Sequence, residues 1–226
     1  LVHYGLGLRV SSSPAMVRGN LAEFGAYYKI KRGMSQKDDS HFERLLTHRF
    51  KKNNFFNAEE ELYNSINIAK MFEEKLYERQ LRNIISYQKE KVENIEGLKH
   101  PVRLFTDFEY ENLIVDLKST LRLPKKPKID HLRQQALYSV LHDKPISLLY
   151  CSPKKTLWYD LTKQDVKNGY KELARDFKSL ENYIDMCDND IKKAIKITPL
   201  NTDPSPFYWD NNIKSAAIKV WENINK

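Results

Sequence analysis

The chain has 226 residues, of which 41% are hydrophobic and 30% charged, so it can bury a sizeable core and is not a disordered protein. Its seven glycines form neither a GxGxxG nor a GxxxxGK[ST] loop, and HExxH and GxSxG motifs are absent, which excludes several common enzyme classes. Cys151 and Cys187 are too few for a four-thiolate site. A net charge of +8 and a pI of about 9.2 favour a polyanionic partner.

The first part of the chain predicts helices. Three serines and Pro14 form a helix-start signal, which predicts a helix over residues 15–30 that ends at Gly33. Apolar residues recur at helical spacing over 58–79, which predicts an amphipathic helix. No segment approaches the roughly 20 apolar residues that span a bilayer, and the start shows no signal peptide, so we expect no membrane contact and a cytoplasmic location.

From about Ser86 the hydrophobic period shifts toward two, as in strands. We expect one strand pair over 102–109 and 112–118 and a second over 146–151 and 156–161, with a helix over 128–142 between them. Thr162 is expected to cap a long helix over 163–188. Three prolines then break the chain before a last helix over 213–224: Pro199, Pro204 and Pro206.

This order of elements predicts an α/β fold with a central mixed sheet flanked by helices. We expect one domain over 1–226, with a core at 14–161 and a helical C-terminal part at 162–226. Between residues 119 and 155 there are eight Lys or Arg residues and two acids, so this segment holds most of the excess positive charge.

The first strand pair carries the strongest chemical signal. Asp116 and Lys118 share a strand face, about 6.7 Å apart, because side chains alternate along a strand. A hairpin loop of two residues (110–111) or of four places Asp107 opposite Ile114 and Asp116 opposite Phe105. We favour the four-residue loop, because Tyr-Glu is not a preferred two-residue turn. The two aspartates are then diagonal neighbours on one face, with Cβ atoms roughly 7 Å apart.

Two carboxylates at that separation can share a divalent cation. Hard oxygen ligands with open coordination positions suit Mg²⁺ or Mn²⁺, which keep part of their water shell and bind substrate phosphates. Without a site of this kind, the same residues form an exposed hairpin with ordinary surface charges.

The spacing Asp107, eight residues, then Asp116-Leu117-Lys118 resembles the PD-(D/E)xK nuclease superfamily, specifically its RecB-like exonuclease branch. Gln134-x-x-x-Tyr138 is similar to the QxxxY motif of that branch. The segment 18–23 resembles its early helical motif, which ends in a metal-binding residue, and Glu23 is the candidate here. The order helix, hairpin, helix, strand also matches the restriction-endonuclease-like core, and small members of this branch are encoded by many phages.

The resemblance implies metal-dependent hydrolysis of DNA phosphodiester bonds. Asp107 and Asp116 are expected to hold Mg²⁺ or Mn²⁺, with Glu23 and the Leu117 carbonyl as further ligands. Lys118 is expected to orient the attacking water or to stabilise charge on the phosphate. Gln134 and Tyr138, one helical turn apart, are expected to position the DNA backbone or the lysine. An iron–sulfur cluster, present in some relatives, is not expected, because the chain has too few cysteines.

We therefore predict a DNA exonuclease that acts on duplex ends in phage-type DNA degradation, recombination or repair. A single-strand-binding or annealing protein is an expected partner besides DNA. A structure-selective endonuclease on the same fold and a non-catalytic basic DNA-binding module remain as alternatives. The residues expected to contact DNA phosphates are basic ones near the motifs: Arg18, Lys125, Lys126, Lys128 and Arg133.

Overall fold

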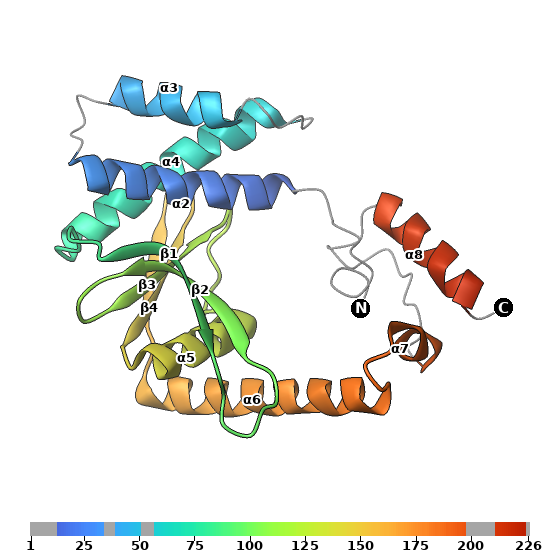
Figure 1. Ribbon diagram of the computed structural model, residues 1–226. Coiled ribbons are helices and arrows are strands. Elements are labelled where there is room, and N and C mark those ends of the chain that lie inside the picture. Colours follow the sequence, from blue (N-terminus) through green and yellow to red (C-terminus); the bar gives the residue numbers. More distant parts are fainter. Residues whose placement is uncertain (1–12, 34–38, 51–56, 198–210, 225–226) are drawn as a thin grey trace. The chain divides into compact units, whose positions relative to one another are not determined.

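The computed structural model describes residues 13–33, 39–50, 57–197 and 211–224 (Figure 1). Its first helix, α2 (Pro14–Arg32), confirms the expected start and end. The Ser13 hydroxyl accepts a hydrogen bond from the Met16 N–H at 3.2 Å, and Gly33 closes the helix in the left-handed conformation with φ 58°. The two cap residues, Ser13 and Gly33, therefore set the ends of this helix, as the sequence predicted.

The remaining helices follow the predicted order, with two short additions. The long helix begins with reciprocal capping, because the Thr162 hydroxyl accepts from the Asp165 N–H while the Asp165 carboxylate accepts from the Thr162 N–H. The helices are α3 (Asp39–Phe50), α4 (Ala58–Glu78), α5 (Ile129–His142), α6 (Lys163–Met186), α7 (Ile191–Ile197) and α8 (Asn211–Ile224). The three prolines at 199, 204 and 206 lie outside the described residues.

Five strands form one mixed sheet, which confirms the predicted α/β class. Its order is β1-β2-β3-β4-β5, with antiparallel neighbours except for the parallel pair β3 and β4, which α5 connects. The strands are β1 (Ser86–Glu93), β2 (Val102–Glu109), β3 (Ile114–Ser119), β4 (Ile146–Cys151) and β5 (Thr156–Asp160).

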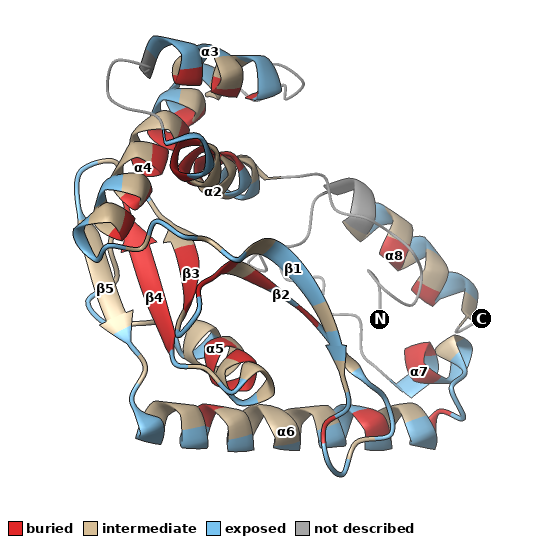
Figure 2. Ribbon diagram, turned by 60° about the vertical axis from the view of Figure 1, so that its left-hand side comes forward, coloured by how far each residue is buried: buried red, intermediate tan, exposed pale blue. Residues whose placement is uncertain are grey.

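Helices cover both faces of this sheet (Figure 1). One core joins α2, α3 and α4 to the sheet residues Phe108, Val115 and Leu117, so these side chains mark one face. The alternate residues of β3 face α5. Strand β4 is buried over its whole length whereas β1 at the sheet edge is largely exposed (Figure 2). The predicted amphipathic helix packs as expected, with Ala69, Phe72 and Leu76 in the core.

The chain divides into two compact units, and the boundary falls within α6, after Arg175. The larger unit comprises 13–96 and 100–175 and contains the sheet. In the smaller unit, the Lys99 N–H donates to the Glu181 carboxylate at 2.6 Å, and Ala217 and Trp221 pack with Ile195. None of the helices in the described ranges combines the length and apolar character needed to cross a membrane.

Candidate active site

The hairpin of β2 and β3 has a different register from the predicted one. The Tyr110 N–H donates to the Leu113 carbonyl at 2.8 Å, which closes a two-residue loop of Glu111 and Asn112. Phe108 pairs with Val115 and Glu109 with Ile114, so the predicted pairing of Asp107 with Ile114 and of Asp116 with Phe105 is wrong by two residues. Continued by one more pair, this register would bring Asp107 opposite Asp116. A two-residue shift preserves alternation, so the two aspartates still share one face.

The two strands separate just beyond these pairs. In a continued ladder the Leu117 N–H would bond the main chain of residue 106, because hydrogen-bonded pairs alternate. Instead it donates to Oδ2 of Asp107 at 2.9 Å. The Asp107 side chain thus takes the place of a strand partner and is fixed in the fork between β2 and β3. Burial raises the pKa of Asp107 well above its usual value, and repulsion from Asp116 and Glu23 raises it further.

Asp116 and Lys118 form a buried ion pair on the β3 face that α5 covers. Lys118 Nζ lies 2.7 Å from Asp116 Oδ2, and the Asp116 side chain is only 3% exposed. Apart from this ammonium, Oδ2 has no donor among the described residues. Burial disfavours the Lys118 ammonium, yet the carboxylates of Asp116 and Asp107 raise the lysine pKa above its usual value. Lys118 is therefore protonated at neutral pH.

Helix α5 presents a polar stripe to this ion pair. Gln135 Nε2 donates to Asp116 Oδ1 at 2.8 Å, and Lys118 Nζ donates to Gln134 Oε1 at 3.4 Å. Gln134 Nε2 in turn donates to the Tyr138 hydroxyl at 3.0 Å, so the predicted Gln134 and Tyr138 lie beside the lysine. The sequence interpretation missed Gln135. Polar side chains at helical spacing on an inward face were the signal for it.

His131 belongs to the same stripe and was also missed. Its Nδ1 lies 2.8 Å from the Tyr150 hydroxyl, and the two rings stack with centroids 5.6 Å apart. Burial lowers the pKa of His131, and the nearby Lys118 ammonium lowers it further. Tyr150 comes from β4 and is fully buried, so this pair supports α5 against the sheet next to the ion pair.

Glu23 approaches the aspartates from α2 but does not contact them directly. Helix α2 passes close to the end of β3, because a Cβ on Gly19 would lie only 3.1 Å from the Ser119 hydroxyl. One turn later, Glu23 accepts a short hydrogen bond from the Gln88 side chain of β1, and that same amide donates to Asp107 Oδ1 at 3.3 Å. Burial, with repulsion from Asp116, raises the pKa of Glu23 to about 7 despite these donors.

The donor set fits a divalent cation of the Mg²⁺ type in part. Asp107 and Asp116 offer hard oxygens, and Asp116 Oδ2 is a buried acceptor with no donor besides the Lys118 ammonium in the described parts of the chain. A strand residue points its N–H and C=O to the same side, so the Leu117 carbonyl faces the fork as its N–H does. Within the described ranges no three Asp, Glu, His or Cys side chains are grouped to hold an ion. The Gln88 amide bridges Glu23 and Asp107, and the described residues show no direct hydrogen bond between these two carboxyl groups.

The predicted DNA-contacting residues separate into two groups. Lys125, Lys126 and Lys128 are exposed in the segment between β3 and α5. Arg18 is 6% exposed and pairs with Glu61 at 2.6 Å, which argues against the DNA contact that the sequence predicted for it. A buried carboxylate on α4 binds it inside the helical layer.

Arg133 is also engaged within the protein. Its Nε lies 2.7 Å from the Glu172 carboxylate of α6, which ties α5 to that helix. Of the residues predicted to contact DNA, Lys125, Lys126 and Lys128 are therefore the exposed ones, and no such ion pair engages them within the described residues.

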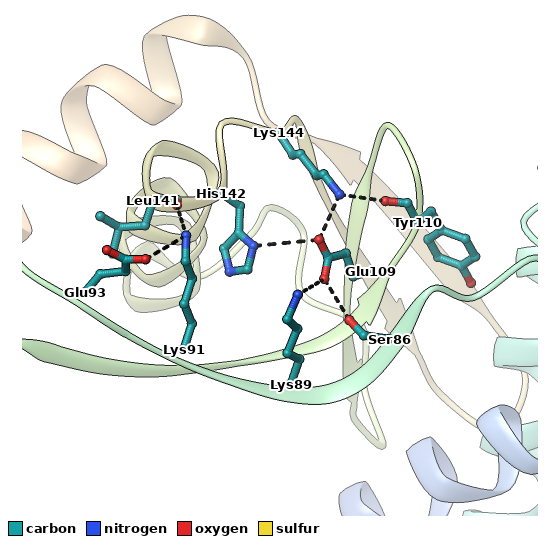
Figure 3. A network of polar contacts seen from close by, with 9 residues as sticks. All are labelled: Ser86, Lys89, Lys91, Glu93, Glu109, Tyr110, Leu141, His142 and Lys144. Carbon is teal, nitrogen blue, oxygen red and sulfur yellow. Dashed lines mark hydrogen bonds and ion pairs between the residues drawn. The ribbon is translucent and has the colours of Figure 1, made fainter.

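A second polar cluster lies at the other end of the hairpin, around Glu109 (Figure 3). Lys144 Nζ donates to Glu109 Oε1 at 2.8 Å, and Ser86 and Lys89 donate to Oε2. His142 Nδ1 lies 4.0 Å away. Burial disfavours the Glu109 carboxylate, but the donors outweigh it and lower the pKa to about 2. All these partners of Glu109 come from the protein itself, and two lysines and a hydroxyl hold the carboxylate in place, which indicates a structural role.

We expect Glu109→Gln to lower the free energy of unfolding by about 1–3 kcal/mol, because two lysines lose their shared carboxylate. The folded-state pKa of about 2 is below the unfolded-state value, so the stabilisation is present above about pH 4.5 and is lost as the pH falls toward 2. Urea unfolding at pH 7 and pH 3 measures both effects. Glu90→Gln, at an exposed carboxylate of the neighbouring strand β1, is the matched control and should cost less than about 0.5 kcal/mol. Equal stability of Glu109→Gln and the wild type at pH 7 would contradict the structural role.

Comparisons with known proteins do not assign the chain to a family. No protein-family model matches it, and no curated protein matches it. Among solved structures, it is similar to the one described as the crystal structure of SSO0001, with 15% identity and a TM-score of 0.35 over 79% of this chain and 82% of that chain. At this TM-score the similarity has no bearing on function.

Proposed function

We propose that this protein is a metal-dependent deoxyribonuclease that removes nucleotides from duplex DNA ends. The observation that supports the proposal most is the group in the fork of the hairpin: the carboxylates of Asp107 and Asp116 lie near enough to repel each other, and the Lys118 ammonium pairs with Asp116. Asp107, Asp116 and the Leu117 carbonyl would hold Mg²⁺ or Mn²⁺. Such an ion, when bound, polarises the scissile phosphate and lowers the pKa of a coordinated water.

Lys118 acts as a donor in this proposal and not as a general base. Its raised pKa keeps it charged, so it can stabilise negative charge that develops on the phosphate oxygens. Because its ammonium is within 2.7 Å of Asp116 Oδ2, it also holds that carboxylate against β3. Gln134 accepts from the lysine, and Tyr138 supports Gln134, which together orient the ammonium.

Substrate binding in this proposal involves the exposed lysines at the start of α5. Lys125, Lys126 and Lys128 lie in the segment that joins β3, which carries Asp116 and Lys118, to α5, which carries Gln134, so in this proposal they bind the DNA phosphates next to the site. These contacts are sequence-independent, as a nuclease that degrades ends requires. A cytoplasmic setting and a single-strand-binding or annealing partner belong to the same proposal.

The deciding experiment incubates the purified chain with end-labelled linear duplex and with closed circular DNA, side by side. We expect Mg²⁺-dependent loss of the linear DNA from its ends, an intact circle, and no reaction in EDTA. Separate 5′ and 3′ labels give the polarity of the reaction.

Cleavage of the circle would replace the exonuclease proposal with an endonuclease on the same site. Binding of DNA with a steep salt dependence and no cleavage with either cation would leave the non-catalytic module. Full activity in EDTA would exclude the proposed use of the fork aspartates.

A further inference from the structure

Strand β1 contains a backbone irregularity directly beside the fork. Tyr87 pairs with Phe108 and Lys89 with Thr106, so Gln88 stands opposite Asp107 in the same register. Its φ is 50°, in the left-handed region, which a residue with a β-carbon adopts only at a cost in free energy. A glutamine in this conformation therefore needs contacts that offset the cost.

The contact formed by this residue is the double hydrogen bond described above. In a regular strand, neighbouring side chains point to opposite faces, yet Tyr87 and Gln88 both reach Glu23. Tyr87 is held by stacking on Tyr27 of α2, with ring centroids 4.1 Å apart. The irregular φ at Gln88 thus turns its amide back toward Glu23 and Asp107, and both carboxylates accept from the same nitrogen.

An amide nitrogen is a weak substitute for a cation between two carboxylates. It carries two N–H donors and a partial positive charge, which offsets part of the repulsion between Glu23 and Asp107. A divalent ion would offset it far better, and an ion shared by Glu23 and Asp107 would compete with the Gln88 nitrogen for the same carboxylate oxygens. Gln88 is exposed, so its side chain has room to leave.

We propose that Gln88 is a displaceable placeholder for the divalent cation. Its amide holds Glu23 and Asp107 in position in the metal-free protein and is displaced when the ion brings Glu23 into its coordination shell. The ion then competes with two hydrogen bonds, so Gln88 lowers the metal affinity of the site. This inference rests on the proposed metal-dependent function and adds Gln88 to it as a positioning residue.

The test measures Mn²⁺ binding to the full chain by titration calorimetry, with no DNA present. Gln88→Gly removes the amide and suits the positive φ, so the fold is retained and binding should tighten about tenfold. Gln88→Lys places a permanent ammonium between the carboxylates and should weaken binding at least about tenfold. Glu90→Gln, on the same strand and paired with Arg103, is the matched control and should leave the affinity unchanged.

Opposite signs for the two variants would establish the placeholder, because damage to the fold cannot tighten binding. Weaker binding in Gln88→Gly would overturn it and identify Gln88 as a ligand through its carbonyl oxygen. Unchanged binding in both variants would overturn it as well. If neither the wild type nor Gln88→Gly binds Mn²⁺, the proposed metal-dependent function itself is refuted. Differences between the variants alone test only the role of Gln88.

Discussion

Asp116→Asn is expected to lower the rate of Mg²⁺-dependent DNA cleavage at least about a hundredfold while the fold is retained. The asparagine keeps the size of the side chain and an oxygen for the Gln135 amide, so the α5 contact survives. It removes the charge that the ion requires and leaves the Lys118 ammonium facing a neutral group. Rates on end-labelled linear duplex, with circular dichroism to check folding, measure the effect.

Glu111→Gln is the matched control, because Glu111 is an exposed carboxylate in the turn of the same hairpin. It should cleave at the wild-type rate. Cleavage by Asp116→Asn within tenfold of the wild type would mean that the fork aspartates do not hold the ion, and the active site would have to lie elsewhere.

The element order could be predicted from the sequence because periodicity and caps are local signals. Ser13, Pro14 and Gly33 mark both ends of α2, and the Thr162 cap marks the start of α6. The register of the β2–β3 hairpin could not be predicted in the same way. It depends on which two residues form the turn, and Asn112 is the one turn-favouring residue among 110–113, which leaves the loop at 111–112 or at 112–113.

The shared face of Asp107 and Asp116 was nevertheless predictable. A slip of two residues leaves the alternation of side chains unchanged, so the conclusion about the face holds although the pairing was wrong. The Leu117 N–H donates to the Asp107 carboxylate and not to the backbone of β2. No sequence pattern marks this contact, because it depends on how the two strands separate in the fold.

The sequence did not show which of the predicted site residues are buried in the fold. Arg18 lies in a motif, but helical phase alone does not tell whether a basic residue faces solvent or a carboxylate on a neighbouring helix, and here it faces Glu61. Gln88 carried no signal at all, because a positive φ is rare at glutamine and occurs only where surrounding contacts impose it. Residues of this kind emerge only when the folded chain brings distant segments together.

Glu23→Gln is expected to change how the stability of the metal-free protein depends on pH. The folded-state pKa of Glu23, about 7, is above the unfolded value of 4.5, so between these pH values the folded chain binds more protons. Its contribution to the free energy of unfolding therefore falls as the pH rises from 5 to 8. In EDTA, the free energy of unfolding of Glu23→Gln should therefore rise by about 1–3 kcal/mol relative to that of the wild type between pH 5 and pH 8.

Comparison with the variant is needed because His131 and His142 have lowered pKa values and change stability with the opposite sign in the same pH range. These contributions are common to both proteins and cancel in the difference. Thermal unfolding at pH 5 and pH 8 measures it, and a pH-independent difference would show that Glu23 is not under strain in the fork. Millimolar Mg²⁺ at pH 8 should stabilise the wild type more than Glu23→Gln, because only the wild type has the carboxylate whose repulsion the ion removes.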